Sequence, residues 1–148
     1  MVTFVLVKWL RPRREQPAQP NTLGRVGWHE LLTADWEKAF AFYSKIFGWQ
    51  KAKTSITVAG AGTGQLFSAG GQMIGGMVTK PPNVPVSFWL YDFNVGDIDA
   101  AAKRVKAGGG QILGGPLEVP GGGWIIECAD RQGAIFALAE KRGPRAGK

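Results

Sequence analysis

The sequence of 148 residues predicts an α+β fold in which two tandem βαβββ modules wrap around a central cavity. Residues 28–49 and 90–111 repeat one pattern of acids, alanines and glycines at a constant spacing of 62, as from Glu30 to Asp92 and from Asp35 to Asp97. A strand, a helix and three further strands are predicted in the same order in each copy. Because this length suits one domain, we expect two halves that share a single sheet.

Module one, residues 25–80, opens with a predicted strand over residues 26–32. Asp35 offers an N-cap oxygen and Gly48 permits the left-handed conformation that ends many helices, so a helix is predicted between them. Its apolar stripe is expected to pack on the sheet and comprises Ala39, Phe42, Tyr43, Ile46 and Phe47. Three strands are expected to follow, over residues 49–58, 65–68 and 73–78.

Module two, residues 86–140, begins after a proline-rich link that cannot continue a strand. From Trp89 to Val95, every second residue is aromatic or apolar while Asp92 and Asn94 lie between them, which is typical of a strand with two chemically different faces. Asp97 is the expected N-cap of the second helix. The remaining strands are predicted over residues 111–113, 124–128 and 134–139.

The positive charge of the chain is concentrated at its two ends. Residues 1–25 and residues 141–148 each carry a net charge of +4, which leaves −1 for residues 26–140 out of the total of +7. A nucleic-acid-binding face needs its Lys and Arg on the folded body, so no nucleic-acid partner is expected. We interpret residues 1–24 as an appendage, either flexible or an added strand, and residues 141–148 as a basic tail.

The first ten residues are mainly apolar but far too few to span a membrane, and the basic residues follow this run instead of preceding it as in a secretory signal. No membrane partner is therefore expected. Cys128 is the only cysteine, which excludes a disulfide within the chain. These features favour a cytoplasmic location.

Five segments occur in the order of a known superfamily. They are residues 28–35 (WHELLTAD), 39–43 (AFAFY), 46–49 (IFGW), 93–101 (FNVGDIDAA) and 130–133 (DRQG). Together they resemble the vicinal oxygen chelate superfamily of glyoxalases, bleomycin resistance proteins and extradiol dioxygenases, over residues 25–140. The resemblance implies a U-shaped mixed β-sheet around a central cavity, with the helices on its outer face, and a homodimer.

The resemblance also implies four positions for metal ligands, two of them seven residues before a helix-opening acid and two of them four residues after a turn glycine. In this chain these positions hold Trp28, Leu90, Gly75 and Ala137. None of these side chains has a donor suited to a divalent ion. We therefore expect no cofactor, and a divalent metal only if the alignment is displaced by one residue, with His29 and Glu30 as donors.

His29 is the only histidine. Because a strand alternates its faces, His29 should point away from Trp28 and toward the helices. We interpret His29 as a hydrogen-bonded structural residue rather than a ligand.

Glu30 and Asp92 lie two residues beyond the first-strand ligand positions and are equivalent under the repeat. They should approach each other across the pocket, where two carboxylates disfavour joint ionisation and one can act as a general base. We expect them to anchor a hydroxyl, an amine or a cation of a ligand. The alternative, in which each acid is satisfied by nearby backbone groups, stays open.

The remaining expected pocket residues are Trp28, Gly75, Phe88, Leu90, Asn94 and Ala137. Aromatic walls and two acids suit a planar or cationic organic molecule. Three functions follow: a small-molecule binding protein of the sequestration or resistance type, a glyoxalase-class lyase or isomerase, or a non-catalytic regulatory subunit. The enzyme would be metal-free through Glu30 and Asp92, or metal-dependent through His29 and Glu30.

Overall fold

The computed structural model describes residues 19, 21–58, 62–119 and 122–141, so most of the predicted appendage and basic tail lie outside the described residues. The elements are β1 (Val26–Thr33), α1 (Trp36–Phe47), β2 (Gln50–Val58), β3 (Gly62–Ala69), β4 (Gln72–Thr79), β5 (Phe88–Asn94), α2 (Ile98–Ala107), β6 (Gln111–Val119), β7 (Gly123–Ala129) and β8 (Ile135–Lys141). Their order confirms two successive βαβββ modules. Within the described ranges, no helix has the length and apolar content needed to cross a membrane.

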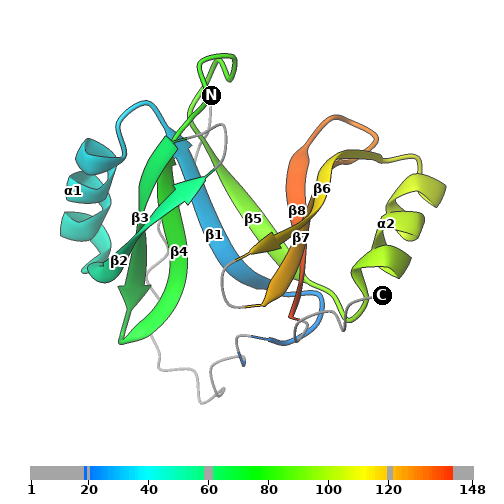
Figure 1. The fold of residues 1–148 in the computed structure, drawn as a ribbon, viewed down its shortest axis with the longest axis horizontal. Coiled ribbons are helices and arrows are strands. Elements are labelled where there is room, and N and C mark those ends of the chain that lie inside the picture. Colours follow the sequence, from blue (N-terminus) through cyan, green and yellow to red (C-terminus); the bar gives the residue numbers. More distant parts are fainter. Residues whose placement is uncertain (1–18, 20, 59–61, 120–121, 142–148) are drawn as a thin grey trace, which may run out of the picture.

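The eight strands form one mixed sheet in the order β2-β3-β4-β1-β5-β8-β7-β6. The modules join in its middle, where β1 pairs with β5 in the antiparallel sense, and each of these two strands pairs in parallel with the last strand of its own module. Figure 1 shows α1 and α2 on opposite outer flanks, with the strands of both modules between them. The predicted α+β fold class is confirmed.

Both helices begin at the predicted acids. The Asp35 carboxylate accepts a hydrogen bond from the Lys38 backbone N–H, and the Asp97 carboxylate accepts one from the Ala100 backbone N–H. Gly48 ends α1 with a φ of 69°, a left-handed conformation that costs glycine little because it has no Cβ. The sequence repeat therefore reflects one capping arrangement used twice.

The predicted packing stripe of α1 is partly wrong. Phe40 is the buried residue of this helix, whereas Phe42 is 53% exposed and Ile46 and Phe47 are also exposed. Phe42 lies roughly 200° around the helix from Phe40, so the two side chains cannot face the sheet together. The apolar residues of α1 therefore extend over a wider arc of the helix than the part that contacts the sheet.

Each helix covers its own hydrophobic core. Leu31, Phe40, Phe67 and Met77 form the core under α1, and Trp89 of β5 packs against it. Ile98, Ala101, Ile126, Cys128 and Leu138 form the core under α2, and Phe93 of β5 packs against that one. Because side chains alternate along a strand, Leu90 and Asp92 must lie on the opposite face of the sheet. We call this the inner face.

The predicted place of Gly75 in the pocket is wrong. Gly75 pairs with His29, and a Cβ on it would overlap the His29 carbonyl oxygen and lie 2.5 Å from Phe67 Cζ, on the α1 side. Gly76 instead pairs with Glu30 on the inner face. The register shifts between Phe67 and Ser68, and this irregularity displaces β4 by one residue relative to β8.

This register predicts different costs for alanine at the two glycines. Gly75→Ala should lower the free energy of unfolding by about 1–3 kcal/mol, because the added methyl overlaps backbone and a fully buried ring. Gly76→Ala should cost less, since the nearest atom to its Cβ is Ile56 Cδ1 at 3.2 Å, the end of a flexible side chain. Urea denaturation of both variants at one pH measures the difference, and a larger loss for Gly76→Ala would contradict the register.

Candidate functional site

A row of side chains crosses the junction of the modules on the inner face. Trp28 of β1 pairs with Asp92 of β5, Asp92 pairs with Ala137 of β8, and Ala137 pairs with Glu127 of β7. Paired residues of neighbouring strands point to the same face. The strands that flank the junction therefore bring two acids, an indole ring and a methyl group into one line.

Asp92 is the more deeply buried of the two acids in this row. Its side chain is 3% exposed, and its Oδ1 atom has no hydrogen-bond partner within the described part of the chain. Burial raises the pKa of Asp92 to about 8, with further contributions from the charges of Glu30 and Glu127. At neutral pH Asp92 is therefore mostly protonated, and it can donate a hydrogen bond to a ligand.

Glu30 lies diagonally across from Asp92, because Glu30 pairs with Leu90 in the antiparallel register. Burial raises the pKa of Glu30, the charge of Glu127 raises it further, and hydrogen bonding from the Trp28 side chain opposes the rise. The structure thus brings together Glu30 and Asp92, the two acids that the repeat relates. The alternative of backbone satisfaction does not account for Asp92 Oδ1.

Glu127 is a third acid of this face, which the sequence analysis does not identify. It comes from β7, which is separated from β1 by β5 and β8, yet its charge acts on both Glu30 and Asp92. The curvature of the sheet and the length of the glutamate side chains bring these groups within electrostatic reach. One signal was present in the sequence, since Glu127 is a lone acid in the apolar run from Trp124 to Cys128.

His29 lies on the other face, as its predicted structural role requires. Its Nδ1 atom is 2.9 Å from the carbonyl oxygen of Ile74, and its ring meets that of Tyr91 edge-on. His29 and Glu30 therefore point to opposite sides of the sheet and do not fit a shared metal site. No three His, Cys, Asp or Glu side chains of the described ranges converge on a point where an ion could be held.

The other predicted pocket residues have separate positions. Leu90 and Ala137 are buried beside Asp92, and Phe88 pairs with Leu32 at the far end of the same face. Asn94 lies at the end of β5, where its side-chain amide donates to the Thr22 carbonyl. Asn94 therefore fastens the segment that precedes β1.

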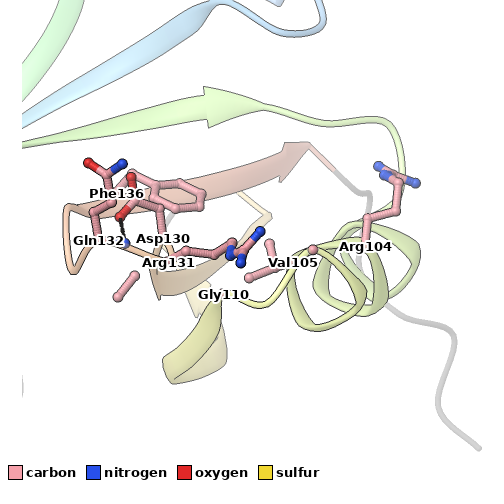
Figure 2. Close-up of a pocket in the computed structure, with 9 residues that line it drawn as sticks. Arg104, Val105, Gly110, Asp130, Arg131, Gln132 and Phe136 are labelled. Carbon is pink, nitrogen blue, oxygen red and sulfur yellow. Dashed lines mark hydrogen bonds between the residues drawn. The ribbon is translucent and has the colours of Figure 1, made fainter.

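Two cavities of the described residues are lined by neither Glu30, Asp92 nor Glu127. The larger, of about 410 Å³, lies between the end of α2 and the loop from β7 to β8 (Figure 2). Arg131 extends along it against the end of α2, where a Cβ on Gly109 would lie 3.3 Å from Arg131 Cδ. A cation in this place stabilises a helix C-terminus, so we interpret Arg131 as a helix-end contact. The smaller cavity, of about 200 Å³, adjoins Asn94 and Glu140.

The raised pKa of Asp92 predicts how stability depends on pH. The native state binds this proton more tightly than the unfolded chain, whose Asp has a pKa of 3.8. The free energy of unfolding should therefore be highest below pH 4 as far as Asp92 contributes, and it should fall by up to about 1.4 kcal/mol per pH unit until pH 8. In Asp92→Asn this contribution is absent, so urea denaturation should show a shallower fall.

Glu118→Gln is the matched control, because Glu118 is exposed on the edge strand β6 and pairs with Trp124, on the face away from Asp92. The control should keep the pH dependence of the wild-type protein. Equal slopes for Asp92→Asn and wild type would show that Asp92 titrates as an ordinary carboxylate.

Two known proteins match most of this chain. "Putative glyoxylase CFP32" of Mycobacterium tuberculosis (strain CDC 1551 / Oshkosh) is 34% identical over 131 residues, which are 88% of this chain and 49% of that protein. "Anthracycline biosynthesis protein DnrV" of Streptomyces peucetius is 29% identical over 132 residues, 80% of this chain and 47% of that protein. The chain thus spans about half the length of these relatives.

Solved structures share the fold at low identity. A methylmalonyl-CoA epimerase in complex with methylmalonyl-CoA and NH4+ has a TM-score of 0.60 and 16% identity, over 83% of this chain and 100% of that chain. The Mn(II)-bound glyoxalase from Novosphingobium aromaticivorans has a TM-score of 0.61 and 16% identity, over 82% of this chain and 40% of that chain.

The family described as the Glyoxalase/Bleomycin resistance protein/Dioxygenase superfamily matches residues 24–138, which is most of the chain. Together with the 34% identity to the mycobacterial relative, this match shows that the protein belongs to that superfamily.

Proposed function

We propose that the inner face binds a small organic molecule and that the protein acts by sequestration or resistance. The observation that carries this proposal is Asp92, which is 3% exposed and has an unpartnered Oδ1 atom. Buried polar atoms in folded proteins nearly always have a partner, because an unsatisfied one costs about 1–3 kcal/mol. A ligand that accepts or donates a hydrogen bond at this atom would remove that cost.

The surroundings of Asp92 favour a ligand with a flat apolar body. The Trp28 ring and the Leu90 side chain lie on the same face, and Ala137 adds only a methyl group beside Asp92. Ligand sites commonly combine apolar walls with a few polar groups that fix orientation. The relative that is named for anthracycline biosynthesis supports a role with small organic molecules.

A second function is favoured by the electrostatics of the two acids. With a pKa of about 8, Asp92 can supply a proton near neutral pH, while Glu30 beside it can accept one. This pair suits a metal-free lyase or isomerase, and the relative named as a glyoxylase supports that class. Mass spectrometry separates the two functions: an enzyme converts a co-purified compound on incubation, whereas a sequestering protein returns it unchanged.

Titration with two dyes of similar shape tests binding directly. Proflavine is a planar cation at neutral pH, and acridone is a planar neutral molecule. At least one dye should quench tryptophan fluorescence with a stoichiometry of one per chain. Asp92→Ala should weaken this binding about tenfold or more, because the hydrogen bond at the buried carboxyl group is lost.

Glu118→Gln should bind like the wild-type protein and serves as the control. Circular dichroism establishes that each variant is folded before titration. Failure of both dyes to bind, or unchanged affinity in Asp92→Ala and Trp28→Ala alike, would rule out the inner face as the binding surface.

A further inference from the structure

We infer that the inner face selects organic cations, such as ammonium-bearing or amidinium-bearing aromatic compounds, and that Glu127 is the residue that gives this charge selectivity. The inference rests on the proposed function and adds the class of ligand. It depends on the arrangement of three acids from different strands, Glu30 from β1, Asp92 from β5 and Glu127 from β7.

The geometry places Glu127 on the far side of Asp92 from Glu30. Ala137 separates Asp92 from Glu127 in the register, so only a methyl group lies between the two acids at the level of the sheet. On the other side of Glu127, a Cβ at Gly114 would lie 3.6 Å from Glu127 Oε2, so the carboxylate lies over a glycine. Small residues, Ala137 and Gly114, therefore pair with both acids in the register.

None of the three acids has a cationic partner among the described residues. The ion pair found in those ranges joins Asp35 to Lys38, on the surface at the start of α1. His29 and Cys128, the titratable neighbours in β1 and β7, are on the opposite face of the sheet, and β8 contributes the apolar Ala137. Acids held close together raise one another's pKa, and a cation from outside the chain stabilises their ionised forms.

The spacing of the acids suits a cation of molecular size. They affect one another electrostatically, yet in the described part of the chain no three such groups converge closely enough to coordinate a metal ion. An aromatic cation distributes its charge over several atoms, so separate carboxylates can each contact part of it. Its ring can also lie on Trp28, whose π face attracts cations.

The ratio of affinities for proflavine and acridone tests the selectivity in the full chain. Wild-type protein should bind proflavine about tenfold more tightly than acridone, since one charge pair in a partly buried site contributes about this much. In Glu127→Gln the ratio should fall close to one while the affinity for acridone stays unchanged. Glu118→Gln removes an equal charge from the outer face and should keep the wild-type ratio.

Each other outcome counts against the inference. Equal affinity of the wild-type protein for the two dyes would overturn the cation selectivity and leave the proposed function intact. A ratio that falls equally in Glu127→Gln and Glu118→Gln would assign the preference to net charge rather than to Glu127. Absence of binding by both dyes would overturn the proposed function and this inference together.

Discussion

The alternation of side chains along β5 determines which residues face the two hydrophobic cores and which face the inner side of the sheet. β5 is the central strand that pairs with β1 of module one and with β8 of module two. Its outward residues supply Trp89 to the core under α1 and Phe93 to the core under α2. A shift of one residue would move Asp92 into those cores and the aromatic rings out of them, so both cores fix Asp92 on the inner face.

This fixed position explains why a buried carboxyl group without a partner is tolerated. The free-energy cost of the unpartnered carboxyl group arises at one residue, whereas the aromatic contacts that hold β5 in register are spread over two cores. Trp89 alone meets the rings of Tyr43, Trp49 and Phe67, and its indole N–H donates to the Tyr43 hydroxyl group. Folds commonly retain a locally unfavourable group where a site needs it and offset the cost elsewhere.

The sequence predicts the parts of this fold that depend on local chemistry. Asp35 and Asp97 define the starts of the helices because an N-cap needs only its own side chain and the next turn of backbone. The alternation of side chains around Glu30 and Asp92 can be predicted from the sequence for the same reason, because it depends only on neighbouring residues of one strand. The face on which Gly75 lies cannot be predicted in this way, because it depends on a register shift between β3 and β4 that no single strand reveals.

Glu127 shows a second limit of prediction from the sequence. The apolar run that contains it predicts a buried strand correctly, but which acids face Glu127 depends on the order of four strands across the sheet. The extent of contact along α1 also depends on tertiary packing, so the exposure of Phe42 was not predictable from helical spacing alone. Position along a strand can be predicted from the sequence, whereas proximity across the sheet needs the fold.

Ligands should bind on the inner face and not in the larger cavity beside α2. A crystal structure of the protein with proflavine distinguishes the two places. We expect the dye against the Trp28 ring, with a ring amino group within hydrogen-bond distance of Asp92. A dye bound between α2 and the loop from β7 to β8, with Asp92 uncontacted, would show that the inner face is not the binding surface.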